Sequence, residues 1–226
     1  MIYALFYSYI NPPNQVDYPA ACNAAEILLL HEKLSKKIWI AVASSLLSKG
    51  VRLLCDPASL AILSSATGSL PLSSTHIHPA DPSVDFDTEF LDLILAVRTV
   101  PSISEAISFI NAHSSHHTDA IVTETAANGE LFCRAVDSAG TFVNASTRFA
   151  DGFRYGFGTE VGISTGRIHA RGPVGLEGLV IYKYVLVSGD GAQGHIASEY
   201  GVGPGKKPYK HINLGTSSRP TFASAQ

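Results

Sequence analysis

The stretch from Asn144 to Lys183 reads NASTRFADGFRYGFGTEVGISTGRIHARGPVGLEGLVIYK and governs how the rest of the chain is interpreted. Glycine recurs through it, interleaved with Arg148, Arg154, Arg167 and Arg171. Glycine is expected where the backbone turns sharply or approaches a ligand closely, and arginine side chains suit carboxylate or phosphate groups. A long surface loop with solvated arginines has the same composition, so spacing alone leaves both interpretations open.

The order of the amino acids in this stretch favours a ligand-binding segment over a solvated surface loop. NASTRFADGFRYGFGTEVGIST followed by IHARGPVGLEGL resembles the C-terminal signature of glutamate-5-semialdehyde dehydrogenases, also called gamma-glutamyl phosphate reductases, in the aldehyde dehydrogenase superfamily. Three further stretches are similar to the same family in the same order: DYPAACNAAEILLLHE from Asp17, DTEFLDLILAV from Asp87 and SHHTDAIVTE from Ser115. The resemblance extends over most of the chain.

Short apolar runs alternate with segments of helical spacing, which is typical of an α/β fold with parallel strands. The expected strands are Val51–Cys55, Phe90–Val97, Asp119–Glu124 and Thr141–Asn144. The expected helices are Pro19–Lys33, Ile38–Leu47, Pro57–Ser65, one capped by Ser102, and Asn128–Asp137, with a loop over Ala66–Pro82. The resemblance implies an aldehyde-dehydrogenase-like catalytic domain with a mostly parallel sheet covered by helices.

Four segments are expected along the chain. Residues 1–16 form an irregular lead, residues 17–178 the catalytic domain, and residues 188–226, rich in Gly, Ser and Lys, a flexible tail. Between them, Leu179–Val187 is rich in β-branched and aromatic residues, which favours a strand. The resemblance implies that this strand leaves the catalytic domain and pairs with a neighbouring subunit, giving a homo-oligomer.

Cys22 is the candidate nucleophile. Pro19 and the alanines after it predict a helix start, where free N–H groups and the helix dipole favour a thiolate. The residues alone fit a buried structural cysteine better, whereas the resemblance implies the nucleophile, because PAACNA is where the family carries it. Cys55 closes an apolar strand and is expected in the core.

The resemblance implies an oxidoreductase that uses NADPH to reduce L-glutamyl 5-phosphate to L-glutamate 5-semialdehyde and phosphate, the second step of proline biosynthesis. A thiolate displaces phosphate to give a thioester, hydride transfer gives a thiohemiacetal, and its collapse releases the aldehyde. Because phosphate is a good leaving group and no water attacks in the reductive direction, no dedicated carboxylate base is required.

Binding residues are assigned on the same basis. Glu89 stands where the superfamily places a glutamate that binds the nicotinamide ribose, although an exposed acidic residue before a strand fits the pattern equally. Arg148 or Arg171 is expected to bind the substrate carboxylate or phosphate, with Asp151 near its amino group. Three further signature residues, Asn144, Ser146 and Thr147, are assigned to the substrate site without separate roles, and Glu160 lies in the same signature without an assigned role.

Histidines and cysteines give little indication of a metal. The three cysteines lack CxxC spacing, so neither a zinc site nor a disulfide framework is indicated, and no metal is expected. The alternative is a histidine site made of His76, His78, His113, His116 and His117. His169 and the pair His116–His117 could instead bind phosphate, and structural roles remain open for each.

Composition excludes several classes of protein. Hydrophobic residues at 46% and charged residues at 15% describe a soluble globule, and a net charge of −3 without a basic block argues against nucleic acid. No signal peptide or membrane span is indicated, because Pro12 and Pro13 interrupt the apolar opening early. The expected location is the cytoplasm.

The family's cofactor domain precedes the cysteine motif, and nothing upstream of Asp17 could form a nucleotide-binding fold. The chain is therefore expected to be truncated and to bind NADPH poorly. The alternative to catalysis is a non-catalytic fragment or pseudoenzyme of the family that acts only through subunit association.

Overall fold

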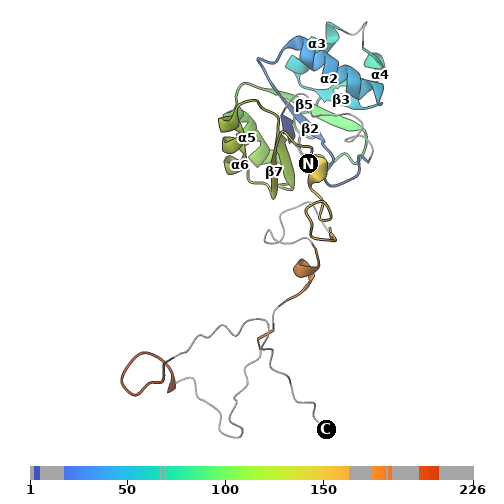
Figure 1. Cartoon of the computed structure of the whole chain (residues 1–226). Helices are drawn as coiled ribbons and strands as arrows, with labels where there is room; N and C mark the ends of the chain where they lie inside the picture. The colour runs from blue at the N-terminus through green and yellow to red at the C-terminus, as the bar shows by residue number, and fades with distance from the viewer. Residues whose placement is uncertain are drawn as a thin grey trace, which may run out of the picture. The chain divides into compact units, whose positions relative to one another are not determined.

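The computed structural model describes residues 3–5, 18–66, 68, 70–162, 175–181, 183–184 and 199–208. Two compact units make up the chain, Met1–Val180 and Ile181–Gln226. The first unit holds the sheet and the helices that cover it, coloured blue to yellow in Figure 1.

A parallel sheet forms the centre of the first unit. Among the described residues it has seven strands in the order β4-β3-β5-β2-β1-β6-β7, and every neighbouring pair is parallel. The bounds are β1 Tyr3–Leu5, β2 Ile27–His31, β3 Arg52–Cys55, β4 Ile77–Pro79, β5 Ile94–Val100, β6 Thr118–Ile121 and β7 Gly140–Val143. Parallel strands require crossover connections, and helices supply them. The predicted α/β class is confirmed.

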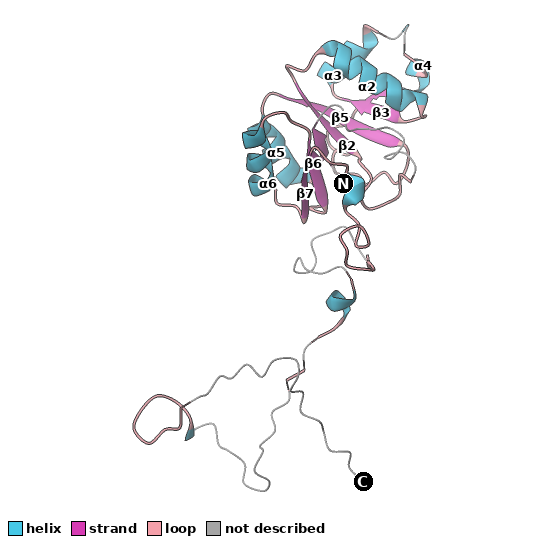
Figure 2. Ribbon diagram, in the orientation of Figure 1, coloured by secondary structure: helices cyan, strands magenta, loops and turns pink. Residues whose placement is uncertain are grey.

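Helices cover both faces of this sheet, as the cyan coils on either side of the magenta strands show in Figure 2. The group of α2, α3 and α4 lies on one side in Figure 1, and α5 and α6 lie on the other. The bounds are α2 Lys36–Ser48, α3 Pro57–Ser64, α4 Ser73–His76, α5 Ile103–His113 and α6 Ala126–Ala135, with 3-10 turns η2 Thr147–Phe149 and η3 Leu176–Leu179. None of the helices in the described part of the chain is long and apolar enough to span a bilayer.

The core has two layers because side chains alternate along β2. Ile27 and Leu29 join a cluster with residues of α5 and α6, whereas Leu28 and Leu30 join a cluster with residues of α2 and α3. All four are at most 3% exposed. A strand buried on both faces is a continuous apolar run rather than an alternating one.

That run explains why the predicted helix from Pro19 to Lys33 is wrong. Its good helix formers are overridden, because Ile27–His31 pairs with β1 and β5 as the central strand and buries Ile27–Leu30 in both layers. The residues before it, 18–26, adopt turns instead. This cysteine segment leads Cys22 to the amino end of β2.

Two other expectations are corrected. Three residues of the lead expected to be irregular form β1, whose backbone pairs with both β2 and β6. The expected loop Ala66–Pro82 contains α4 and β4, and β4 adds a strand at the edge beside β3. Elements of three or four residues are too short to show a hydrophobic period, so none was expected at these positions.

Most other elements are confirmed within a few residues. The helices α2, α3 and α6 and the strands β3, β6 and β7 coincide with the expected segments. Ser102 caps α5, because its side chain accepts a hydrogen bond from the Glu105 N–H at 3.2 Å. The strand expected at Phe90–Val97 begins only at Ile94. Its first residues are drawn aside by Glu26, whose Oε1 accepts a hydrogen bond from the Phe90 N–H at 2.8 Å.

In the second unit, Tyr200 and Lys207 form a β-bridge, and Lys207 Nζ lies 2.8 Å from Glu199 Oε2. The predicted strand Leu179–Val187 lies partly outside the described residues. Of its described part, Leu179 ends η3, and residues 180, 181, 183 and 184 are not paired as a strand within this single chain. Ile181 and Tyr184 are 95% and 94% exposed. Pairing with another subunit stays a prediction, as does the mobility of the tail.

Candidate active site

Cys22 lies in the cysteine segment just before β2, the central strand of the sheet. The Ala21 N–H donates to the Tyr18 carbonyl at 3.2 Å, and the Ala24 N–H donates to the Ala21 carbonyl at 2.9 Å. These bonds form turns rather than a helix, so the expected help from a helix dipole to the Cys22 thiolate is absent here. The residue is exposed at the surface.

Side chains from far along the chain fix this segment. The Asn23 Nδ2 donates to the Ala150 carbonyl at 3.0 Å, and its Oδ1 accepts from Arg148 at 2.7 Å. The Thr147 hydroxyl donates to the Asn23 carbonyl at 2.8 Å. The second guanidinium nitrogen of Arg148 donates to the Tyr18 carbonyl at 2.8 Å. We call this set of contacts the Asn23 clamp. It holds the backbone on either side of Cys22 against η2.

Glu160 is brought to the site by a tight loop. Its Oε2 accepts a hydrogen bond from the Gly152 N–H at 2.7 Å. A Cβ at Gly152 would lie 2.7 Å from the Thr159 carbonyl oxygen and 2.8 Å from the Glu160 Cβ. No side chain fits there, so glycine at position 152 is what allows the loop to close on itself and to present Glu160.

His117 reaches the same place from the amino end of β6. Its Nδ1 shares a hydrogen bond of 2.9 Å with the Thr118 hydroxyl, and this contact orients the ring. The loop before it is held by His116, whose Nδ1 lies 2.7 Å from the Asp137 carbonyl oxygen. Asp119, fully buried on β6, accepts hydrogen bonds from the hydroxyls of Ser114 and Ser138.

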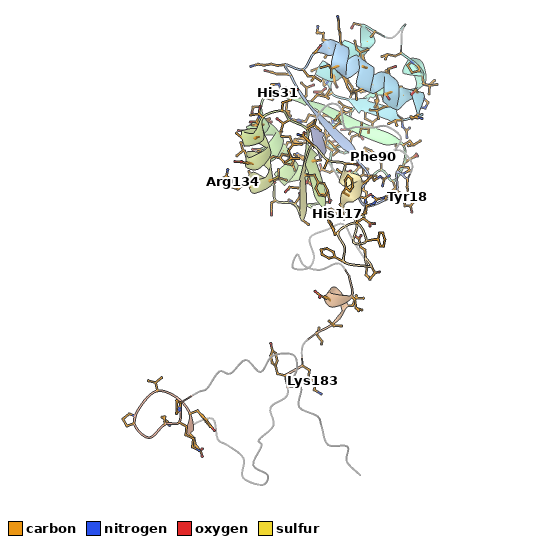
Figure 3. All side chains as sticks on the ribbon, in the orientation of Figure 1. Tyr18, His31, Phe90, His117, Arg134 and Lys183 are labelled. Carbon is orange, nitrogen blue, oxygen red and sulfur yellow. The ribbon has the colours of Figure 1, made fainter. Side chains whose placement is uncertain are left out.

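Cys22, His117 and Glu160 form one group, which we call the cysteine cluster. The thiol sulfur, a ring nitrogen and a carboxylate oxygen all lie within 4.8 Å of one another. Figure 3 shows His117 at the end of the sheet where Tyr18 also lies, near the η2 turn. His31, at the carboxyl end of β2, is labelled at the opposite end.

The surroundings of the cysteine cluster favour a protonated Cys22 thiol and a neutral His117 ring. Although Cys22 is exposed as a residue, partial burial of its thiol raises the pKa of Cys22, and the negative charges of Glu160 and, more weakly, Glu89 raise it further. Burial lowers the pKa of His117, against the opposing effect of Glu160. A neutral imidazole thus lies beside a thiol, which is the arrangement in which histidine accepts a proton.

The other residues singled out from the sequence divide into four groups. Glu89 is exposed, and its charge acts on the Cys22 thiol. Ser146 caps η2 by accepting from the Arg148 N–H, and Asp151 accepts from the Arg154 N–H at 3.0 Å, close to the Asn23 clamp. Asn144 lies away from them, at the carboxyl end of β7, where both ends of its amide bond to the Thr123 backbone. Arg167, His169 and Arg171 lie outside the described residues.

The histidines considered as a metal site are not brought together. His113 pairs with Asp87 at 2.9 Å, His116 bonds to the Asp137 carbonyl, and only His117 joins Cys22. His76 and His78 lie on α4 and β4, at the edge of the sheet. From the sequence, His117 was expected to bind phosphate or to have a structural role, and Glu160 had no assigned role. Nothing in the spacing of these residues along the chain links them to Cys22.

A separate cavity of about 390 Å³ opens at the carboxyl ends of the strands, lined by residues that include His31, Ser102, Ile121 and Asn128. Parallel α/β sheets commonly bind ligands at that edge. The cavity does not contain Cys22, which lies at the amino ends. The described residues of its lining include no cysteine and no carboxylate, so the cysteine cluster is the stronger candidate for thiol chemistry.

A solved protein shares this fold. The crystal structure of gamma-glutamyl phosphate reductase from Thermotoga maritima matches with a TM-score of 0.68 at 36% sequence identity, over 85% of this chain and 45% of that one. The parallel sheet, with a cysteine in front of its central strand, is an α/β fold of the aldehyde-dehydrogenase-like kind.

Curated relatives extend the match to the sequence. Gamma-glutamyl phosphate reductase of Synechococcus elongatus is 52% identical over 197 residues, covering 87% of this chain and 42% of that protein. The enzyme of the same name from Saccharomyces cerevisiae is 48% identical over 207 residues, covering 88% of this chain and 44% of that protein. No protein-family model matches the chain. The chain is homologous to the gamma-glutamyl phosphate reductases, as its motifs indicated, and it spans less than half the length of the curated relatives it matches.

Proposed function

We propose that this chain takes part in the reduction of L-glutamyl 5-phosphate to L-glutamate 5-semialdehyde and phosphate, with Cys22 as the nucleophile and NADPH as the reductant. The observation that carries the proposal is the cysteine cluster, in which the thiol, a ring nitrogen and a carboxylate lie within 4.8 Å of one another. The substrate class is taken from the relatives, which are gamma-glutamyl phosphate reductases.

The first step is a proton transfer within the cluster. The raised pKa of Cys22 and the lowered pKa of His117 make thiol and neutral imidazole the resting pair. His117 Nδ1 is engaged by Thr118, which leaves Nε2 to accept the thiol proton. Glu160 opposes the thiolate but stabilises the imidazolium, because its charge raises the pKa of His117. It therefore helps the proton to stay on the ring.

Attack on the acyl phosphate follows. The Cys22 sulfur forms a bond to the acyl carbon while the carbonyl electron pair moves to oxygen. When that pair returns and re-forms the carbonyl, the bond between the acyl carbon and the phosphate oxygen breaks, phosphate leaves with the electrons of the broken bond, and a thioester remains on Cys22. The backbone N–H of Cys22 is assigned as one donor to the developing oxyanion. The Asn23 clamp keeps the cysteine segment in place during attack.

The fit of a nicotinamide cofactor depends on Glu89. The charge of its exposed carboxylate raises the pKa of the Cys22 thiol, so the two side chains lie on the same side of the fold. A bound nicotinamide cofactor needs a hydrogen-bond acceptor for its ribose hydroxyls on that side. When bound, NADPH supplies the hydride that reduces the thioester carbon. We assign Glu89 to cofactor binding, and the chain's own contribution to this step is to hold the thioester.

Substrate binding is assigned to the η2 region. Asp151 is proposed near the substrate amino group, with Ser146, Asn144 and the arginines Arg148 and Arg171 as further contacts. Arg148 and Thr147 also bond to the cysteine segment, so their part in the proposal is chiefly to position it. In this proposal residues 17–178 form the catalytic domain and Leu179–Val187 forms a strand between subunits. The proposed location of the protein is the cytoplasm.

The test is the reverse reaction. Purified chain is mixed with glutamate 5-semialdehyde, phosphate and NADP, and NADPH is followed by absorbance. We expect slow activity, limited by weak cofactor binding, in the unaltered chain and in Cys133→Ala, whose exposed thiol lies on α6, but none in Cys22→Ala. A folded chain that is inactive would support the non-catalytic alternative. Activity that survives in Cys22→Ala would refute the role of Cys22.

A further inference from the structure

The cysteine cluster also has the composition of a metal site. Thiolate, imidazole and carboxylate are the three ligand types that Zn²⁺ uses, and one of each converges here from three distant segments. These three residues do not have the short spacing along the chain by which zinc sites are recognised in a sequence. They come instead from the cysteine segment, the start of β6 and the loop that contains Gly152.

The distances agree with one ion. Zinc lies about 2.0–2.3 Å from such ligand atoms, so two ligands of a tetrahedral ion are roughly 3.3–3.8 Å apart. The donor atoms of Cys22, His117 and Glu160 lie within 4.8 Å of one another. Small rotations of exposed or half-buried side chains close the remaining gap. Three protein ligands would leave a fourth position for water.

Two of the ligands already have the supporting contacts that metal sites use. The Nδ1 of His117 is engaged by the Thr118 hydroxyl, so Nε2 is the nitrogen left for an ion. Glu160 Oε2 is held by the Gly152 N–H, so Oε1 is free of that bond. Such outer contacts fix the tautomer and the orientation of a ligand before the metal arrives.

We propose that Cys22, His117 and Glu160 bind a thiophilic divalent cation of the Zn²⁺ type. Two negative ligands offset the charge of the ion, and the neutral imidazole completes the set. The sulfur of Cys22 is then a ligand of the ion and is not available to attack a substrate. If the proposed function holds, metal binding therefore blocks the nucleophile and makes the enzyme reversibly sensitive to zinc.

The test uses Co²⁺ as a coloured substitute for Zn²⁺. The metal-free chain is titrated with Co²⁺, and the thiolate-to-cobalt charge-transfer band and the visible bands of four-coordinate cobalt are recorded. We expect one ion per chain and loss of the spectrum on addition of Zn²⁺. Neither substrate nor cofactor is present, so the result does not depend on whether the chain is catalytically active.

Variants assign the ligands. Cys22→Ser should abolish the charge-transfer band, and His117→Gln and Glu160→Gln should each weaken binding by about tenfold or more. Cys133→Ser and His76→Gln serve as matched controls and should keep both band and affinity, because Cys133 lies on α6 and His76 on α4. Far-UV circular dichroism checks that each variant is folded. A band that survives in Cys22→Ser, a band lost in Cys133→Ser, or no band in the unaltered chain would each overturn the proposal.

A second readout links the site to reactivity. Zn²⁺ should slow alkylation of Cys22 by iodoacetamide, measured by peptide mass, and should leave Cys133 unaffected. Equal protection of both thiols would mean non-specific binding and would contradict the proposal. If the chain binds metal but has no enzymatic activity, the metal site is supported and the proposed function is not. If the chain is active but binds no metal, the proposed function is supported and the metal site is refuted.

Discussion

The central sheet and the cysteine segment in front of it are held by different forces. In the sheet, Ile27–Leu30 are buried on both faces by apolar side chains, so stability comes from area removed from water. The cysteine segment has no regular secondary structure, and hydrogen bonds from Asn23, Thr147 and Arg148 fix it. The first region makes the fold stable, and the second places a reactive thiol.

This difference means that stability and reactivity should respond to different substitutions. A change in the core should lower the free energy of unfolding and leave the cluster's chemistry intact while the chain is folded. A change in the Asn23 clamp should cost less stability and more activity, because about 1 Å of misplacement at a reacting group can cost about a hundredfold in rate.

The largest effect on stability is expected from Trp39→Ala in α2. Trp39 is 1% exposed, and its indole N–H donates to the Ser59 carbonyl at 3.1 Å. Removing so large a buried ring should lower the free energy of unfolding by about 3–5 kcal/mol, measured by urea denaturation. Trp39→Phe is the matched control and should lose less, because it keeps most of the apolar volume. Equal losses in the two variants would contradict burial as the main cause.

An intermediate effect on stability is expected from Asn23→Ala. The change leaves the Ala150 carbonyl and an Arg148 N–H without this partner, which should cost about 1–3 kcal/mol. Because Cys22 is the adjacent residue, the rate of the reverse reaction should fall by about a hundredfold.

Asp56→Ala is the control for that change. Asp56 bridges two segments in the same way, because its carboxylate accepts hydrogen bonds from the Ser59 N–H at 2.8 Å and from the Thr99 N–H at 2.9 Å. It should lose similar stability and keep its rate. If both variants lose activity alike, the clamp has no special role in positioning Cys22.

The smallest effect is expected from Glu160→Gln, which keeps an acceptor for the Gly152 N–H but removes a charge. That charge raises the pKa of Cys22, so the variant's thiol pKa should fall and its pH profile of alkylation by iodoacetamide should move to lower pH. Glu89→Gln should move the profile in the same direction but less, because its charge has the weaker effect on the thiol. An unchanged or upward-shifted profile in Glu160→Gln would contradict the assigned electrostatics.

Much of the sheet region could be predicted from the sequence. Apolar runs and capping residues located β3, β6, α2, α3 and α5, because burial and capping leave local patterns. The helix expected from Pro19 to Lys33 failed because local propensity favours a helix there, while packing on both faces requires a strand at Ile27–His31. The three-residue strands β1 and β4 were too short to carry a pattern.

The site could be predicted only in part. Cys22 was found through family motifs, but its setting was not, since the helix start expected there does not form. The grouping of Cys22 with His117 and Glu160 depends on the parallel order of the strands and on the loop that Gly152 permits. These are tertiary relations between distant segments, and residue spacing within one segment does not encode them.

The most direct test of Cys22 as the acyl-accepting nucleophile is its reaction with freshly made L-glutamyl 5-phosphate in the absence of cofactor. Released phosphate is measured, and the quenched chain is digested and mapped by mass spectrometry. The account predicts phosphate and acylated chain in a one-to-one ratio, with a hydroxylamine-sensitive thioester on the Cys22 peptide. An acyl group on Cys133, or a folded chain that releases no phosphate, would contradict it.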